Sequence, residues 1–179
     1  SGMLLSPNRT FFPLYIQDLG HPVIVLSALA TAQQIMGLLG AWFGGALSDA
    51  LGRKRALLLG QLGALLACLA FLYPALGWIA PLWILSGIGA GVNTVASQSY
   101  LIDAAPPAYL GILSAFYNWG STLGGATSSP LAGLLLERQG FRALGTVMSL
   151  LAALAIGLNV LALPPAKGER RAVARRSLF

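Results

Sequence analysis

The amino-acid sequence predicts an all-α integral membrane protein, and three observations predict this fold class. Hydrophobic residues make up 56% of the 179-residue chain and charged residues only 9%, which is too little charge to cover the surface of a soluble domain. Apolar segments of about 20 residues recur along the chain, and a helix needs this length to cross a membrane. The sequences between these segments are polar and turn-like, which indicates separate helices.

The first segment, residues 3–19, is the shortest and most polar of the predicted helices. Its continuous apolar part covers only residues 10–16, which at 1.5 Å per residue spans about a third of a hydrocarbon core of ~30 Å. Two prolines and the charged Arg9 and Asp18 lie in the rest of it. We therefore expect a short or truncated first span, and a segment lying on the membrane surface is the alternative.

Five further segments are long and apolar enough, or nearly so, to cross the membrane in alternating directions. The turn-like sequences "SDALGRKR", "PALGW", "DAAPPAY" and "ERQGFR" separate them. In order, the segments are 22–48, 56–74, 79–102, 110–136 and 143–163. Together with the short first segment they predict a helical bundle over residues 3–164, followed by a basic tail at residues 165–179.

The basic residues are distributed unequally between the two sides of the predicted bundle. Eight of them fall on the side that holds the turn at 49–55 and the C-terminal tail, whereas two, Arg138 and Arg142, fall on the other side. Loops rich in lysine and arginine stay in the cytoplasm. We therefore predict that the turn and the C-terminus face the cytoplasm from the plasma (inner) membrane. Because these bases cluster beside apolar spans, they indicate topology, and nucleic acid is not an expected partner.

Side chains that could carry catalytic chemistry are few. The single cysteine, Cys68, and the single histidine, His21, provide no metal-ligand spacing. The spans contain no carboxylate pair, Ser/His/Asp set or phosphate-binding loop, so we expect neither an enzyme nor a cofactor. All five acidic residues lie at span ends or in loops, which leaves no proton carrier of the usual mid-membrane kind. They are Asp18, Asp49, Asp103, Glu137 and Glu169.

Polar side chains inside the spans are the candidates for a substrate pathway, because each costs free energy in lipid unless it faces a cavity or another helix. The candidates are Gln33, Gln34, Asn93, Gln98 and Asn118, with Tyr117 and Trp119 beside the last. Hydrogen bonding between helices is the alternative role for each of them. A mid-membrane cavity lined by Gln33, Asn93 and Asn118 would favour transport, whereas a closed apolar centre would favour a scaffold.

Pairs of glycines four residues apart recur in three of the spans. They are Gly40 with Gly44, Gly87 with Gly91, and Gly120 with Gly124. Each pair places two glycines on one face of a helix, where the backbone of another helix can approach closely. The spans are therefore predicted to touch one another in a bundle.

The stretch "GGALSDALGRKRALLLG", residues 44–60, concentrates charge and glycine in one short turn. Gly52 permits a tight reversal, and Asp49 is costly at the end of an apolar helix unless a base or a helix N-terminus pairs with it. The pattern resembles the signature that the major facilitator superfamily carries between its second and third helices. The matching residues are Gly45, Leu47, Asp49, Gly52, Arg53, Lys54 and Leu57, while Ala50 stands where the family usually has arginine.

This resemblance implies a six-helix half bundle of the major facilitator type, with a short or truncated first helix. It also implies a cytoplasmic gating loop at residues 45–57, in which the acting residues are Gly45, Asp49, Gly52, Arg53 and Lys54. A second match, to the antiporter motif of the family, is partial. Gly111, Gly120 and Gly124 fit its spacing and imply helix packing and efflux, but Gly125 and Ser128-Ser129 depart from it.

The implied function is that of a component of a secondary active transporter, which moves a small organic solute by alternating access. Members of the family have twelve helices in two halves, and this chain has the size of one half. It is then a self-pairing half, one half of a split pair or a fragment. A homodimer or a partner half would cover the wall that faces the substrate. A non-transporting membrane scaffold or assembly protein of the same fold is the alternative function.

Overall fold

The computed structural model describes residues 2–162, and the regular structure of this range is entirely helical. The predicted basic tail, 165–179, lies outside the described residues. Five α-helices follow one another, with short 3-10 turns after the third and the fourth. The helices are α1 (Gly2–Asp18), α2 (Val23–Leu51), α3 (Arg53–Leu69), α4 (Leu76–Ala104) and α5 (Leu110–Ala162), and the 3-10 turns are Ala70–Leu72 and Pro107–Tyr109.

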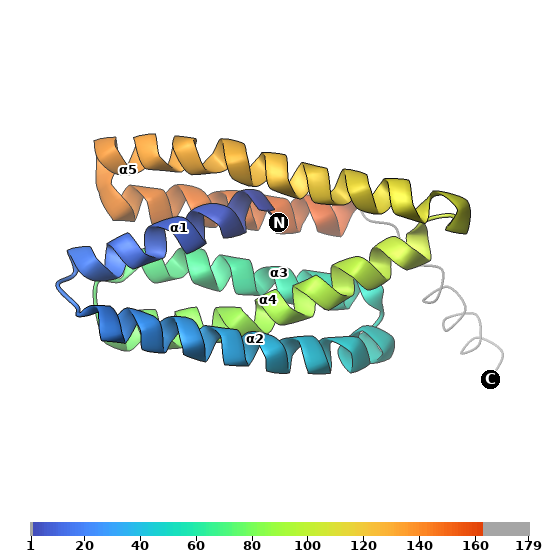
Figure 1. The fold of residues 1–179 in the computed structure, drawn as a ribbon, viewed down its shortest axis with the longest axis horizontal. Helices are drawn as coiled ribbons and strands as arrows, with labels where there is room; N and C mark the ends of the chain where they lie inside the picture. Colours follow the sequence, from blue (N-terminus) through green and yellow to red (C-terminus); the bar gives the residue numbers. More distant parts are fainter. Residues whose placement is uncertain (1, 163–179) are drawn as a thin grey trace.

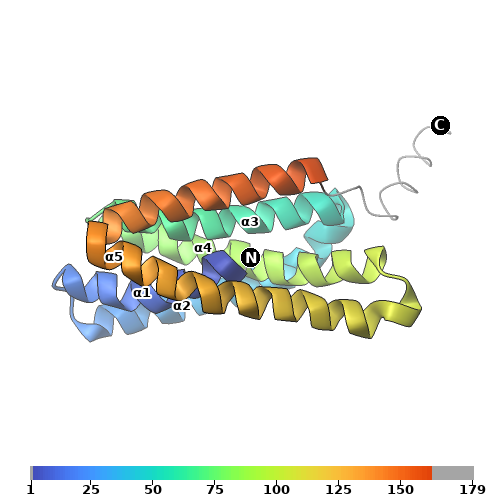
Figure 2. The ribbon, with the colours of Figure 1, turned by 90° about the horizontal axis from the view of Figure 1, so that it is seen from above.

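α5 is folded back on itself at Gly140. This glycine has φ 78° and ψ 179°, a conformation outside the helical region that side chains other than glycine rarely adopt. The two arms of α5 run antiparallel on either side of it (Figures 1 and 2). They correspond to the predicted spans 110–136 and 143–163, and the reversal falls in the predicted separator "ERQGFR".

The connections alternate between the two ends of the bundle (Figure 1). The α1–α2 connection, the α3–α4 connection and the Gly140 turn lie at one end, while Gly52, the α4–α5 connection and the last residues of α5 lie at the other. In the described part of the chain, α2, α3 with its 3-10 turn, α4 and α5 are long and apolar enough to cross a membrane. The turn at 49–55 and the last described residues therefore lie at the same end, as the alternation predicts.

α1 is a short helix that packs into the bundle. It remains helical through both of its prolines, and its 17 residues extend about 25 Å at 1.5 Å per residue. Its buried face carries Phe12, whose ring stacks on Trp83 of α4 with ring centroids 3.4 Å apart, and Tyr15, whose ring packs against Phe71 and Phe141. The packing of α1 among other helices disagrees with the alternative of a separate segment lying on a membrane surface.

Glycines set the distance between α4 and its two neighbours, α2 and α3. A Cβ atom on Gly91 would lie 2.6 Å from the backbone nitrogen of Ala41 in α2, closer than real Cβ contacts allow. On the other side of α4, a Cβ on Gly63 of α3 would lie 2.6 Å from Cα of Gly89. Gly40 and Gly87 likewise face backbone atoms of the opposite helix. The close packing predicted for the first two glycine pairs is therefore confirmed.

The glycines of the first arm of α5 differ from those of α2 and α4. A Cβ atom built on Gly111 or on Gly120 would meet no atom within 4 Å in the described part of the chain. Neither glycine is required by contact with another described helix. The packing role predicted for Gly111, Gly120 and Gly124 remains a prediction.

Candidate functional site

The charged turn between α2 and α3 is a one-residue reversal. α2 ends at Leu51, α3 begins at Arg53, and Gly52 between them has φ 92° and ψ 153°. A residue with a side chain would be strained at this positive φ, so glycine is required here. The reversal places the first residue of α3 beside the last turn of α2, and the predicted tight turn at Gly52 is confirmed.

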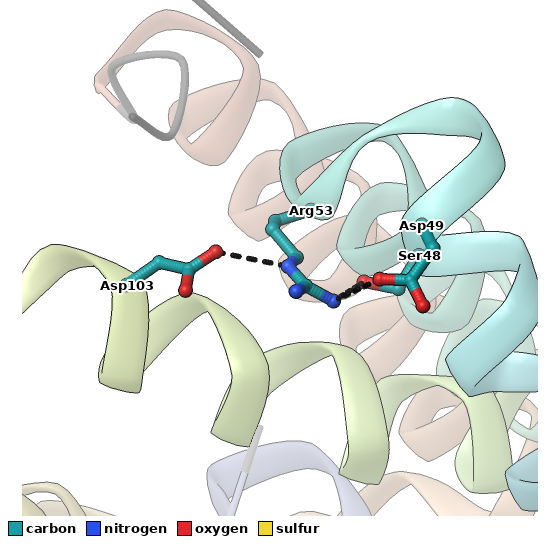
Figure 3. A network of polar contacts seen from close by, with 4 residues as sticks. All are labelled: Ser48, Asp49, Arg53 and Asp103. Carbon is teal, nitrogen blue, oxygen red and sulfur yellow. Dashed lines mark hydrogen bonds and ion pairs between the residues drawn. The ribbon is translucent and has the colours of Figure 1, made fainter. Parts of the chain in front are cut away.

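Arg53 connects three helix ends through its guanidinium group (Figure 3). Its Nη1 donates a hydrogen bond to Oδ1 of Asp49 in α2 at 2.8 Å, and its Nε donates one to Oδ2 of Asp103 in α4 at 2.9 Å. Nη1 also lies 3.4 Å from Oγ of Ser48. We call these four residues the charged end cluster.

The two ion pairs of Arg53 differ in their exposure to water. The side chains of Arg53 and Asp103 are 27% and 30% exposed, whereas that of Asp49 is 71% exposed. An exposed ion pair contributes only about 0.2–1 kcal/mol, because water and salt screen it. Hydrogen bonds to charged groups contribute about 1.5–3 kcal/mol when water is partly excluded. The contact between α3 and α4, from Arg53 to Asp103, is therefore the stronger of the two.

Lys54 connects the same turn to the end of α5. Its Nζ donates a hydrogen bond to the backbone carbonyl of Val160 at 2.7 Å. Val160 lies in the last described turn of α5. Arg53 and Lys54 thus both have partners within the chain, whereas the side chain of Arg55 is exposed.

The remaining residue of the predicted gating loop, Gly45, lies one turn before the charged end cluster. A Cβ on Gly45 would meet no atom within 4 Å, whereas a Cβ on the neighbouring Gly44 would lie 3.1 Å from Cα of Val92 in α4. Gly44 therefore accommodates the close approach of α4. Gly45 leaves open space on the outer face of α2, so its role in the loop remains a prediction.

A small cavity of about 40 Å³ lies among the first four helices. Gln33 and Gln34 of α2 line it, which places two of the predicted substrate-pathway residues together. Nε2 of Gln33 donates a hydrogen bond to Oγ of Ser86 in α4 at 3.0 Å, and Ser86 Oγ in turn donates to the backbone carbonyl of Trp83. Gln33 therefore lines a cavity and also forms a hydrogen bond to another helix, so it has both of the roles that were considered for it.

The other predicted pathway residues lie elsewhere. Asn93 is buried where α4 meets Gly60 of α3, and its Oδ1 has no hydrogen-bond partner among the described atoms. Tyr117 lines a separate apolar groove of about 670 Å³ between the two arms of α5. Gln98, Asn118 and Trp119 are exposed and line neither cavity. Gln33, Asn93 and Asn118 therefore do not share one cavity within the chain.

Two charged residues of these sites were not assigned to them from the sequence. Asp103 ends a span on the same side of the predicted bundle as the Gly52 turn. This common location was the one feature of the sequence that could have predicted its ion pair with Arg53. Arg9, in the polar part of the first segment, lines the small cavity together with Gln33 and Gln34. Among the described residues, no three His, Cys, Asp or Glu side chains gather closely enough to hold a metal ion.

The sequence is similar to a known family and to a known transporter. A family model described as Major Facilitator Superfamily matches residues 1–178. The arabinose-proton symporter of Bacillus subtilis (strain 168) is 32% identical to this chain over 107 residues, which are 59% of this chain and 23% of that protein. The match therefore spans less than a quarter of the length of that relative.

Proposed function

Because the chain belongs to the Major Facilitator Superfamily, we propose that it forms one half of a secondary active transporter that moves a small organic solute by alternating access. The observation that carries the proposal is the bridge from Arg53 to Asp49 and Asp103, which joins the ends of α2, α3 and α4. Family membership and the similarity to a symporter support transport in general. We further propose that α1 to α4 and the two arms of α5 make six membrane crossings.

The charged end cluster is proposed to act as the cytoplasmic gate. Arg53 orders the ends of three helices, so they move together when the bundle rocks. Asp49 uses one carboxylate oxygen on Arg53 and is 71% exposed, so the carboxylate remains accessible to a group outside the chain. A second half can bind there when the cytoplasmic side is closed and leave when it opens. The excess of bases that the sequence predicts for this side, tail included, supports a cytoplasmic location of the gate.

Transport by the purified chain in proteoliposomes tests the proposal. Radiolabelled sugars, organic acids and organic phosphates, arabinose among them, would be offered with and without an imposed proton gradient. Saturable uptake of at least one of them is expected. If folded and correctly inserted chain moves none of them, either alone or together with a co-expressed partner half, transport is contradicted, and a non-transporting scaffold becomes the better interpretation. Directional export from loaded vesicles would distinguish efflux from uptake.

Asp49→Asn is expected to reduce the transport rate about two- to fivefold while leaving membrane insertion unchanged. The substitution retains the shape of the side chain but removes the charge that pairs with Arg53 and faces a second half. The modest magnitude follows from the exposure of the pair, since an exposed ion pair contributes about 0.2–1 kcal/mol. Initial transport rates at matched protein content provide the measurement. Equal rates for variant and parent would contradict a gating role for Asp49.

Pairing with a second half is expected, because one half leaves its substrate-facing wall uncovered. The apolar groove between the arms of α5, lined by residues such as Phe116, Leu131 and Leu151, offers surface for such contact. Counting fluorophores by stepwise photobleaching in dilute bilayers should show two copies of the chain per particle, or one copy after a partner half is co-expressed. A single copy that persists without any partner and still transports would contradict the pairing.

A further inference from the structure

In the six-crossing arrangement proposed above, Arg9 lies near the middle of the membrane. Arg9 precedes Asp18, at the end of α1, by nine residues. At 1.5 Å per residue this separation is about 13.5 Å, which is close to half the thickness of a core of ~30 Å. Gln33 lies at a matching depth in α2, ten residues after Val23, and both distances start from the same end of the bundle (Figure 1). An ionisable residue at this depth is costly and commonly functional.

Arg9 has no counter-charge within the described chain. Its side chain is exposed, and neither of the described ion pairs involves it. The acidic residues of the described range lie at helix ends or turns: Asp18, Asp49, Asp103 and Glu137. A guanidinium group at this depth is stabilised by an opposite charge, by a water-filled cavity or by snorkelling to the membrane surface. Arg9 is therefore available to bind a negatively charged group that comes from outside the described chain.

The cavity that Arg9 lines has mostly apolar walls with a few hydrogen-bonding side chains. Trp83 is 4% exposed, its indole Nε1 can only donate, and this nitrogen has no partner among the described residues. The ring of Phe12 stacks on Trp83 and holds the indole in place. Gln34 lines the same cavity and is exposed. A guanidinium, an unpaired indole N–H and no carboxylate among the lining residues fit a ligand that accepts hydrogen bonds and carries negative charge.

We propose that this cavity binds the anionic head group, a carboxylate or a phosphate, of the transported solute, with Arg9 as its charge partner. The inference rests on the proposed transport function and specifies its substrate class. A volume of about 40 Å³ suits a head group, whereas whole small molecules occupy pockets of roughly 300–1,000 Å³. The remainder of the solute lies outside the cavity, on the side where Arg9 and Gln34 are exposed.

Ligand-induced thermal stabilisation of the purified full chain tests the site with matched pairs of probes. Gluconate is compared with glucose, and glycerol 3-phosphate with glycerol, at constant ionic strength. We expect at least one anion, and neither neutral compound, to raise the unfolding midpoint. Arg9→Gln should raise the apparent Kd of that anion at least tenfold, and Arg9→Lys should raise it less. Arg138→Gln, which removes an exposed charge near the Gly140 turn, should leave the Kd unchanged.

Several results would overturn the site. If the anion stabilises Arg9→Gln as much as the parent, Arg9 does not recognise its charge. The same conclusion follows if the neutral counterpart stabilises the parent as much as the anion does. No response to any anion contradicts it as well. Loss of self-association in Arg9→Gln without any change in anion Kd would assign Arg9 to a carboxylate of a partner half instead.

Transport and binding can be separated in the same preparations. An anion that binds through Arg9 but does not cross the membrane would support the site and contradict the transport function. A neutral solute that crosses at the same rate in Arg9→Gln and the parent would support transport and contradict the anionic substrate class. The two proposals therefore fail through different measurements.

Discussion

Arg53→Gln is expected to lower the transport rate at least tenfold, more than any other single change in the charged end cluster. The substitution breaks the contacts at 2.8 Å and 2.9 Å that hold Asp49 and Asp103 to α3. Hydrogen bonds to charged groups contribute about 1.5–3 kcal/mol, which corresponds to about 10- to 150-fold in an equilibrium. The loss should exceed that of Asp49→Asn, because Arg53→Gln also leaves the part-buried carboxylate of Asp103 without its partner.

Arg55→Gln is the matched control for this experiment. It removes the same charge two residues further along α3, from a side chain that is exposed and makes neither of the two described ion pairs. Its transport rate and topology should match those of the parent. The double variant Arg53→Gln, Asp103→Asn should recover thermal stability but not transport. Equal loss of transport in Arg53→Gln and Arg55→Gln would show that total charge matters, and not the bridge.

Gly91→Ala is expected to destabilise the bundle by about 1–3 kcal/mol, the usual cost of forcing extra volume into a packed contact. The added methyl group would approach the backbone of α2, including the nitrogen of Ala41 at 2.6 Å and the carbonyl carbon of Gly40 at 2.9 Å. Backbone atoms cannot move aside as the end of a flexible side chain can, so the two helices must separate. The unfolding midpoint in detergent, measured by tryptophan fluorescence, should fall.

Gly77→Ala provides the control in the same helix. A Cβ at Gly77 meets no atom within 4 Å, and alanine favours a helix over glycine by up to about 1 kcal/mol. This variant should be as stable as the parent or slightly more stable. If Gly91→Ala unfolds at the same temperature as Gly77→Ala, close contact between α2 and α4 does not limit the stability of the bundle.

Much of the charged turn could be predicted from the sequence because its chemistry is local. Gly52 lies between two apolar spans, and only glycine readily takes the positive φ that a one-residue reversal needs. Asp49 and Arg53 are four residues apart across this reversal and form an ion pair. The second acceptor of Arg53 could not be predicted in the same way. Asp103 is 50 residues distant, and its direction depends on how α4 packs against α3.

The candidate substrate pathway shows the opposite case. Gln33, Asn93 and Asn118 are all polar residues within apolar spans, and this made them candidates for the pathway. Their directions differ: Gln33 faces a cavity, Asn93 is buried against Gly60 of α3, and Asn118 is exposed on the first arm of α5. Arg9 joins Gln33 only because α1 packs into the bundle despite its prolines.

The amino-acid sequence alone is enough to identify an all-helical membrane protein of the Major Facilitator Superfamily, with its charged turn and its last described residues at one end. The lengths and hydropathy of the segments, together with the spacing of glycine and charge, are sufficient for this identification, because the thickness of the membrane sets the length of each helix. The face of each helix that points inward becomes known from the packed bundle. In a membrane, lipid and neighbouring helices are equally apolar, so the hydrophobic pattern does not determine the rotation of a helix. Contacts such as those of Gly40 and Gly91 determine it, and with it the place of Arg9 beside Gln33.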